Sequence, residues 1–463
     1  MGEGYGFVVV ANRLPVDEVV DDAGQRRWTR SPGGLVSALE PVTRQLGGAW
    51  VGWTGGVGEA PEPFDADGVR LHPVPLSADD VDRYYEGQSN ATIWPLFHDL
   101  VEQPVHRQDW RKAYEAVNRR FAEAAAEVAG PAATVWVHDY QLLLVPAMLR
   151  ELRPDVRIGF FLHIPFPPVE LFAQLPRREP LLRGLLGADL VGFQRPLAAR
   201  NFLQLTRQLL GLDPKDDEVE YDGRTVTAGA FPISIDVTAI EDLAGDPAVQ
   251  ARARKLRADL GDRRVLLGVD RLDYTKGIEQ RLTAYRELLA DGAVCADEVV
   301  LVQVATPSRE RVAKYRQLRE RVEREVGRIN GEYGGVGRVP VHYLFQSHAR
   351  EELVALYLAA DTMLVTPLRD GMNLVAKEFV AARIDDQGAL VLSEFTGAAA
   401  ELDDAFLVNP HDTEDIKRAV SRALAAGPDD RAARMRRMRA QVREHDLDRW
   451  ADDFLRALGV TRS

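Results

Sequence analysis

One loop and the helix expected after it combine the residue types that bind a sugar joined to a diphosphate. An apolar run, residues 363–365, is followed by a loop that contains Asp370 and Gly371, and then by the helix-forming residues Leu374–Ala382. A loop that leads into a helix presents unpaired backbone N–H groups and the positive end of the helix dipole, which favour an anion. Asp370 would repel phosphate, but it can accept hydrogen bonds from sugar hydroxyls. Glu378, further into the helix, can do the same for a ribose.

Two cations five residues apart, Arg271 and Lys276, precede Gly277 in a turn. Together they would neutralise a diphosphate and stabilise it as a leaving group without a metal ion. The alternative is a solvated loop in which Arg271 pairs with Asp273. The independent signs of a diphosphate site around Asp370 favour the first interpretation.

Two further candidates, Asp139 and His163, each follow an apolar run. Asp139 is expected either to cap a helix that begins at Gln141, with His138 in the core, or to orient sugar hydroxyls or act as a base. His163 precedes two prolines that fix the shape of its loop, and taken alone it is more typical of a core histidine. The residue types leave both alternatives open.

An aromatic segment and a glycine pair complete the set of candidates. Tyr84, Tyr85 and Trp94 lie in a polar stretch. They favour either a helix packed on a domain surface or a platform for a sugar phosphate. Gly33 and Gly34 end a polar loop and open a helix, so their backbone can approach a phosphate closely.

The apolar runs predict an α/β fold made of doubly wound, Rossmann-like parallel sheets. The runs are continuous rather than alternating in polarity, so both faces of each strand are expected to be covered by helices. Such sheets bind ligands at the carboxyl ends of their strands, where the strong candidates lie. Because the candidates come from both halves of the chain, we expect a single cleft between two domains. The predicted strands are residues 7–10, 134–137, 158–162, 190–191, 265–269, 299–304, 341–345, 362–366, 390–392 and 406–408.

A chain of 463 residues is too long for one core and is expected to form two domains. The boundary is placed near residues 231–236, because a polar stretch precedes it and a new series of strands and helices begins after Arg264. The predicted divisions are an N-terminal domain of residues 1–235, a C-terminal domain of residues 236–446, and an amphipathic segment, 447–463, that packs back across the junction.

Composition narrows the possible partners. The net charge of −13 argues against nucleic acid or an anionic membrane. Cys295 is the only cysteine, which excludes an internal disulfide and a cysteine zinc site. No signal peptide or membrane-spanning run is recognised, so a cytoplasmic location is expected. Dinucleotide and P-loop glycine motifs are missing, and the D-x-D pairs follow no apolar strand, so neither such a cofactor nor a metal is expected.

A series of motifs occurs along the chain: Asn12-Arg13-Leu14-Pro15, Gly33-Gly34-Leu35, Tyr84-Tyr85, Ser89-Asn90, Trp94-Pro95, His138-Asp139-Tyr140, Leu162-His163-Ile164-Pro165-Phe166-Pro167, Val191-Gly192-Phe193-Gln194, Asp270-Arg271-Leu272-Asp273-Tyr274-Thr275-Lys276-Gly277 and Asp370-Gly371-Met372-Asn373-Leu374-Val375-Ala376-Lys377-Glu378. In this order, over nearly the whole chain, they resemble the trehalose-6-phosphate synthases. These are retaining glycosyltransferases with two Rossmann-like domains facing each other across a cleft, the GT-B architecture.

The resemblance implies a substrate pair and a mechanism. The donor would be a nucleoside-diphosphate glucose, with UDP, GDP or ADP as the nucleotide, and the acceptor would be glucose 6-phosphate. The product would be α,α-trehalose 6-phosphate. The acceptor would attack on the same face of the sugar from which the phosphate departs, and the leaving phosphate itself would help to take the acceptor proton, so neither a metal nor another cofactor is expected. A homo-oligomer is usual in the family.

The resemblance also implies roles for individual residues. The expected catalytic set is Asp139, His163, Arg271, Lys276 and Asp370. The donor set comprises the Gly33 and Gly34 loop, Arg271 and Lys276 on the diphosphate, backbone groups of Asp370, Gly371, Met372, Asn373, Leu374 and Val375, and Glu378 on the ribose. The acceptor set comprises Arg13, Tyr85, Trp94 and Arg309 on the phosphate and Asp139 on the hydroxyls.

Three alternatives accompany this interpretation. A pseudo-glycosyltransferase that joins cyclitols, or a glucosylglycerol-phosphate synthase, would use the same fold on other substrates. An inactive regulatory homologue would be expected to lose charged site residues, which this chain retains. Family members often have Phe where Gln88 stands, and some have His where Gln141 stands. Neither position matches a residue assigned a role above, but Gln88 lies near the acceptor segment, so it bears on acceptor preference.

Overall fold

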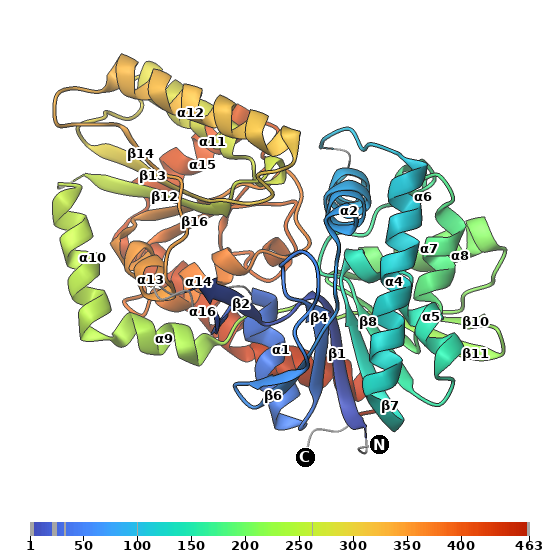
Figure 1. Ribbon diagram of the computed structural model, residues 1–463. Helices are drawn as coiled ribbons and strands as arrows, with labels where there is room; N and C mark the ends of the chain where they lie inside the picture. The colour runs from blue at the N-terminus through green and yellow to red at the C-terminus, as the bar shows by residue number, and fades with distance from the viewer. Residues whose placement is uncertain (1–3, 21–25, 32–33, 100, 262, 461–463) are drawn as a thin grey trace. The chain divides into compact units, whose positions relative to one another are not determined.

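The computed structural model describes residues 4–20, 26–31, 34–99, 101–261 and 263–460. The chain divides into two compact units: Met1–Ile233 together with Asp448–Ser463 form unit 1, and Ser234–Leu447 form unit 2. Each unit contains a β-sheet covered by helices (Figure 1). The divisions predicted from the sequence, after residues 235 and 446, lie close to these boundaries.

Unit 1 is built on a nine-stranded sheet. Neighbouring strands are parallel throughout, except that the two edge strands run antiparallel to their neighbours. A separate antiparallel ribbon pairs β2 (Val16–Val20) with β3 (Arg26–Arg30). The strand order in the sheet is β10 (Glu218–Tyr221), β11 (Arg224–Ala230), β9 (Leu190–Phe193), β8 (Arg157–Phe161), β7 (Ala129–His138), β1 (Tyr5–Arg13), β4 (Ala49–Trp53), β6 (Val69–Pro73) and β5 (Phe64–Ala66).

Unit 2 contains a six-stranded sheet in which every strand is parallel to its neighbours. All of the strands predicted after residue 264 are present, and the central ones are buried apolar runs of the kind that helices cover on both faces. The predicted α/β class with two Rossmann-like sheets is confirmed. The strand order is β14 (Val341–Leu344), β13 (Val299–Thr306), β12 (Arg264–Arg271), β15 (Thr362–Val365), β16 (Ala389–Ser393) and β17 (Phe406–Val408).

The helices fill the gaps between strands, as expected for this fold class. In unit 1 they are α1 (Gly34–Gln45), α2 (Ala78–Asp80), the π-helix η1 (Val81–Ile93), α3 (Trp94–Phe97), α4 (Gln108–Val128), the 3-10 turn η2 (Tyr140–Leu142), α5 (Val145–Leu152), α6 (Val169–Phe172), α7 (Arg178–Leu185), α8 (Pro196–Leu210) and α17 (Leu447–Ala457). In unit 2 they are α9 (Val237–Gly245), α10 (Pro247–Asp259), η3 (Tyr274–Lys276), α11 (Ile278–Ala290), α12 (Ala313–Tyr333), α13 (Arg350–Ala359), α14 (Leu374–Ala382), η4 (Ala398–Ala400), α15 (Thr413–Ala425) and α16 (Pro428–Glu444).

Three strand regions show which strands can and cannot be predicted from the local sequence pattern. The polar stretch before the domain boundary leads into a hairpin of β10 and β11, joined at Asp222 and Gly223, whose φ angles of 48° and 70° are those of a tight hairpin turn. The structure also contains β4 and β6, which the sequence analysis did not predict. Their segments are short, and their strand character depends on neighbours that are distant in the sequence.

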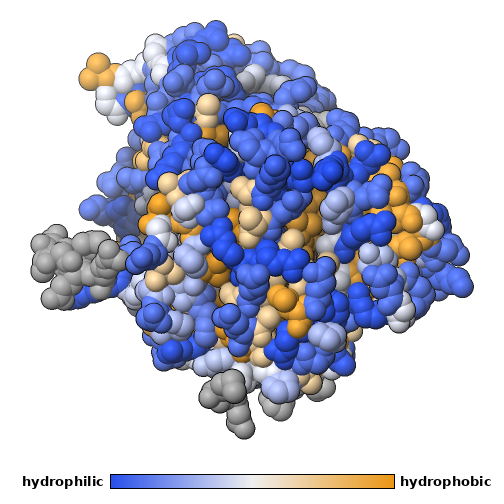
Figure 2. Space-filling model, turned by 45° about the vertical axis from the view of Figure 1, so that its right-hand side comes forward, coloured by the Kyte–Doolittle hydropathy of each residue, from blue (hydrophilic) through white to orange (hydrophobic). Residues whose placement is uncertain are grey.

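The face of the molecule in Figure 2 is mainly hydrophilic, because the long apolar side chains are largely buried.

The final helix, α17, packs on the sheet of unit 1. Its Trp450 and Phe454 rings stack on Trp136 of β7, at centroid distances of 5.2 Å and 4.6 Å. Gly192 of β9 makes room for this contact, because a Cβ atom there would lie 2.6 Å from the Phe454 ring. The chain thus returns to the first unit after completing the second.

We expect Phe454→Ala to lower the free energy of unfolding of unit 1 by about 3–5 kcal/mol, the usual loss when a buried phenylalanine is truncated. Phe454 is fully buried beside Trp136 and Trp450, so urea denaturation followed by tryptophan fluorescence would measure the loss.

Leu197→Ala is the matched control, because Leu197 is 46% exposed on the same unit. It should change the free energy by less than about 0.5 kcal/mol. Equal losses in the two variants would contradict the packing role assigned to α17.

Candidate active site

In unit 2, two loops that follow adjacent strands are joined by an ion pair. Lys276 follows β12, Asp370 follows β15, and the Lys276 Nζ atom lies 2.6 Å from the Asp370 carboxylate. The side chains are only 10% and 15% exposed. The structure therefore brings the predicted diphosphate ligand Lys276 together with the predicted sugar ligand Asp370, and the ammonium offsets the repulsion that this carboxylate would exert on a phosphate.

Asn373 links this ion pair to the start of α14. Its Nδ2 atom donates to the Asp370 carboxylate at 3.2 Å, and its Oδ1 atom accepts from the Ala376 amide at 2.9 Å. The helix begins at Leu374, as predicted, so the positive end of its dipole lies beside Asp370. On the other side of the loop, the Asp370 amide donates to the Phe395 carbonyl at 3.2 Å. A Cβ atom at Gly397 would overlap the Gly371 carbonyl, which shows how closely the two segments approach.

Arg309 is held by a buried carboxylate. Its Nη1 atom lies 3.1 Å from Asp273, and Tyr315 donates to the same carboxylate at 3.0 Å. Burial alone would raise the pKa of Asp273, but the positive charges of Arg309, Arg271 and Lys276 outweigh it and lower the pKa to about 2. Asp273 therefore stays ionised, and Arg309 is an ion-pair partner that the sequence analysis had not identified.

This placement bears on the predicted acceptor role of Arg309. The Arg309 side chain is 6% exposed, and its backbone φ of 47° places it in the left-handed region, which is costly for residues other than glycine. Arg271, by contrast, is exposed at the end of β12. An acceptor contact by Arg309 stays a prediction, and it would have to share the guanidinium with Asp273.

Glu378 of α14, the predicted ribose ligand, has a partner that the sequence analysis missed. Tyr357 of α13 donates to its carboxylate at 3.0 Å. Burial raises the pKa of Glu378, although the Tyr357 hydrogen bond and Arg350 oppose the shift. A second missed group is Arg281, fully buried and bonded to Asp270 and Gln303 at 2.7 Å each. It supports the strand from which the Arg271 and Lys276 loop departs.

In unit 1, Arg13 and Tyr85 meet at Trp53. The Arg13 guanidinium lies 5.1 Å from the Trp53 ring centroid, and the Tyr85 ring lies 5.6 Å from it. Arg13 also pairs with Asp17 at 2.8 Å, and its side chain is 42% exposed. Gly55 leaves the space that the guanidinium occupies, since a Cβ atom there would overlap it. The structure thus groups two predicted acceptor ligands around an aromatic ring that the sequence analysis had not selected.

Trp94 and Tyr84 take structural positions. Trp94 is 4% exposed, and its ring packs against His98 and Tyr140 at 4.1 Å and 5.5 Å. Tyr84 is fully buried and donates to Asn12 at 2.7 Å. The alternative of a packed aromatic helix therefore describes these two residues, whereas Tyr85 stays partly exposed.

Asp139 and His163 are brought together at the ends of β7 and β8. Asp139 has a φ of 75°, its amide donates to the Phe161 carbonyl at 2.8 Å, and its carboxylate accepts from the His163 amide at 3.3 Å. The Asp139 side chain caps no helix, so the alternative of a structural cap is wrong. A strained backbone angle held by neighbouring hydrogen bonds is typical of functional sites.

A pair of imidazoles lies beside Asp139. His138 Nδ1 and His163 Nε2 are 3.1 Å apart, which places one proton between them. His138 is fully buried, and His163 is partly exposed. Burial lowers the pKa of His163 to about 3, and burial together with His163 lowers the pKa of His138 well below its usual value. Both rings are therefore neutral, and the sequence alternative of a core histidine describes His138 rather than His163.

Other predicted positions fall outside these groups. Gly33 lies outside the described residues, and Gly34 begins α1. Within the described residues, no group of three or more His, Cys, Asp or Glu side chains is placed to hold a metal ion. No helix in the described ranges is long and apolar enough to cross a membrane.

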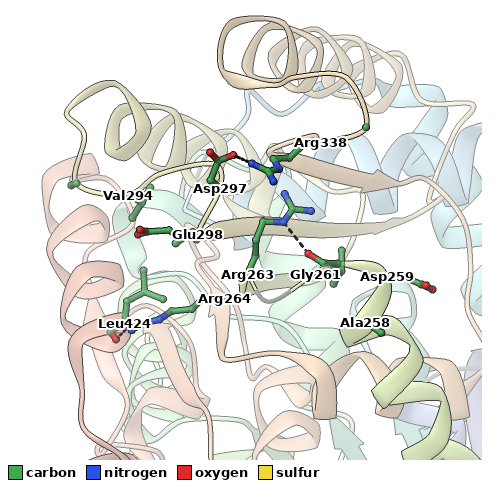
Figure 3. Close-up of a pocket in the computed structure, with 14 residues that line it drawn as sticks. Ala258, Asp259, Gly261, Arg263, Arg264, Val294, Asp297, Glu298, Arg338 and Leu424 are labelled. Atoms are coloured by element: carbon green, nitrogen blue, oxygen red, sulfur yellow. Dashed lines mark hydrogen bonds and ion pairs between the residues drawn. The ribbon is translucent and has the colours of Figure 1, made fainter.

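A cavity of about 860 Å³ lies in unit 2 near the starts of β12 and β13, and none of the predicted site residues lines it (Figure 3). Its three arginines are already engaged. Arg338 pairs with Asp297, Arg263 donates to the Leu260 carbonyl at 2.9 Å, and Arg264 donates to the Leu424 carbonyl. Ligands of doubly wound sheets bind at the opposite, carboxyl ends of the strands, so this cavity is not the substrate site.

Comparison with known proteins agrees with the geometry. Residues 5–459 match the model of glycosyltransferase family 20. A trehalose-6-phosphate synthase of Mycolicibacterium paratuberculosis is 60% identical, over 98% of this chain and 96% of the relative. One of Mycolicibacterium smegmatis is 58% identical, over 98% and 92%.

Solved structures show the same fold. A UDP-forming α,α-trehalose-phosphate synthase of Burkholderia xenovorans superposes with a TM-score of 0.90 at 36% identity, covering 99% of this chain and all of that one. The complex of the Burkholderia xenovorans enzyme with glucose 6-phosphate gives 0.89 at 35%, covering 98% and 100%. An E. coli structure bound with UDP-2-fluoro glucose gives 0.90 at 34%, covering 98% of each chain.

The imidazole pair makes stability depend on pH in a defined direction. Unfolded histidines take up a proton near pH 6.5, but the folded pKa of His163 is about 3. Between these two pH values the unfolded state therefore binds more protons than the folded state. The free energy of unfolding should fall as the pH is lowered through this window, and above the window this pH-dependent loss should be absent.

NMR of the imidazole carbons should show His138 and His163 still neutral at about pH 5, well below the pKa of a free histidine. Urea denaturation across the same range should show a weaker pH dependence in His163→Asn, which lacks one of the two groups. A midpoint near 6.5 at either ring would contradict this assignment.

Proposed function

The chain belongs to glycosyltransferase family 20, and we propose that it carries out the transfer with the residues brought together here. It moves glucose from a nucleoside-diphosphate glucose to glucose 6-phosphate and forms α,α-trehalose 6-phosphate. Several relatives at 57–60% identity over nearly the full chain are trehalose-6-phosphate synthases, which disfavours a cyclitol-joining enzyme or a glucosylglycerol-phosphate synthase.

One observation carries the donor half of the proposal: the ion pair of Lys276 and Asp370 at the start of α14. Lys276 and the exposed Arg271 are positioned to hold the diphosphate, and the first amides of α14 add the positive end of its dipole. Asp370 accepts hydrogen bonds from the glucose hydroxyls. Glu378, fixed by Tyr357, accepts from the ribose.

The acceptor half rests on unit 1. Arg13 and Tyr85, gathered on Trp53, supply a partly exposed cation and a phenol for the phosphate of glucose 6-phosphate. Asp139 orients the acceptor hydroxyls. The buried His138 fixes the ring of His163, which contacts the donor glucose. Trp94 lies largely buried in this region, and its contact with the acceptor phosphate stays a prediction.

The bond changes follow from this arrangement. The bond between the anomeric carbon and the diphosphate oxygen breaks as Arg271 and Lys276 take up the growing negative charge. The acceptor hydroxyl attacks from the same face, and its proton passes to an oxygen of the departing diphosphate. No protein nucleophile and no metal ion is required in this scheme, and the anomeric configuration is retained.

The partner assignments extend the proposal. The substrates are small anions, and the chain carries a net charge of −13, so no nucleic-acid or membrane partner is proposed. A homo-oligomer and a cytoplasmic location, where nucleotide sugars and sugar phosphates are available, stay predictions. The donor nucleotide is UDP, GDP or ADP, and the assay below distinguishes them.

Incubation with EDTA, glucose 6-phosphate and UDP-, GDP- or ADP-glucose in turn should release nucleoside diphosphate and trehalose 6-phosphate with at least one donor. Chromatography of the sugar phosphates would identify the product and the preferred base. Activity that disappears with EDTA and returns with a divalent ion would reject the metal-free mechanism. Turnover only with a cyclitol or glycerol phosphate acceptor would reject the substrate assignment.

Lys276→Ala should lower kcat by about 10²–10³-fold, because it removes a charge that stabilises the leaving diphosphate in the transition state. Steady-state kinetics with saturating donor and acceptor would measure the effect. Lys255→Ala, an exposed lysine on α10 of the same unit, is the control and should be near wild type. Equal rates in both variants would remove Lys276 from the reaction.

A further inference from the structure

A second cavity, of about 520 Å³, lies in unit 1, and four of its ten lining residues are arginine or lysine. It is formed by η1, the start of α4 and the loop before α7. Of the residues assigned to substrate binding, none lines it. Four cations face one carboxylate in the lining: Arg107, Arg111, Lys112 and Arg177 against Glu115.

Two of these cations have no acidic partner. Arg107 pairs with Asp109 at 3.0 Å, and Arg111 pairs with Glu115. Lys112 and Arg177 form no ion pair with any residue that the structure describes. On a chain whose net charge is −13, an uncompensated positive pocket is an exception that attracts an anion.

Two helix N-termini add to the positive potential. Both α4 and α7 begin directly after an arginine, Arg107 and Arg177, and neither N-cap side chain accepts a hydrogen bond from the first turn. Arg177 also has a φ of 53°, an unfavourable angle for a residue other than glycine. Asp109 and Glu179 in the first turns offset part of this potential, but both are paired with arginines.

The floor of the cavity contains an unsatisfied polar group. Gln88 of η1 is 7% exposed and lines the cavity. Its side-chain amide has no hydrogen-bond partner within the described ranges, although a buried amide normally has one. The side chain therefore points a donor and an acceptor into the cavity.

We propose that this cavity binds a small phosphorylated metabolite at a site separate from both substrates. Its volume is that of a small-molecule site. Lys112, Arg177 and the two helix N-termini match phosphate oxygens, and the Gln88 amide matches a hydroxyl or a further phosphate oxygen. Because Gln88 and the predicted acceptor ligand Tyr85 lie on the same helix, an occupied cavity would fix η1 and change the KM for glucose 6-phosphate. This kinetic consequence alone rests on the proposed function.

The test uses pyrophosphate as the probe. Isothermal titration is performed on Arg271→Ala/Lys276→Ala protein, so that the proposed diphosphate site of unit 2 does not contribute. Binding should persist in this background and weaken at least tenfold on adding Lys112→Ala/Arg177→Gly. Glycine is chosen at residue 177 because it tolerates the left-handed backbone. The matched control adds Arg200→Ala/Lys215→Ala, which removes the same charge from exposed positions of unit 1.

The outcomes are distinct. Equal weakening by the control pair would show diffuse charge attraction and overturn the site. Gln88→Leu, which fills the same volume without polar atoms, should also weaken binding, and unchanged affinity would overturn its role. If a short single-stranded oligonucleotide binds more tightly than pyrophosphate, the ligand of the cavity is a nucleic acid, and the proposal of a small metabolite is overturned. In the otherwise wild-type protein, Lys112→Ala/Arg177→Gly should keep basal turnover within twofold, so a failed binding test leaves the proposed function intact.

Discussion

The proposed donor site depends on the ion pair between Lys276 and Asp370. It joins the loops after two adjacent strands of unit 2, and its side chains are only 10% and 15% exposed. Loss of either partner would leave a poorly solvated charge, at a cost of about 3–5 kcal/mol. The pair therefore holds the turn before α11 and the start of α14 in one arrangement before a ligand arrives. Catalysis by electrostatic stabilisation requires this preorganisation.

Unit 1 also holds its candidate residues in a fixed arrangement, but with different groups. Asp139 adopts an unfavourable φ of 75° at the end of β7. Its amide donates to the Phe161 carbonyl of β8, and its carboxylate accepts from the His163 amide, which together hold it there. The imidazole pair beside it is neutral because burial disfavours the charged form of both rings. The helix α17 covers the same sheet through Trp450 and Phe454, so a helix near the C-terminus packs on strands from the first half of the sequence.

Much of this could be predicted because it is local. Continuous apolar runs marked the parallel strands, and the loop from Asp370 into α14 was recognisable from its helix-forming residues. Short strands such as β4 and β6 were missed, since their pairing depends on neighbours distant in the sequence. Partnerships were missed for the same reason: Tyr357 with Glu378, Trp53 with Arg13, and the buried Arg281 network carry no signal at their own positions.

The sequence by itself determined the fold class, the family and the residue types of the site, because hydrophobic periodicity and ordered motifs are properties of the linear chain. Only the tertiary structure decided which candidate side chains are exposed and which are buried in the core. It buried Trp94 and His138, paired Arg309 with Asp273, and left His163 partly exposed. Burial and charge pairing are set by contacts between distant segments, so the same residue type can serve packing in one place and chemistry in another.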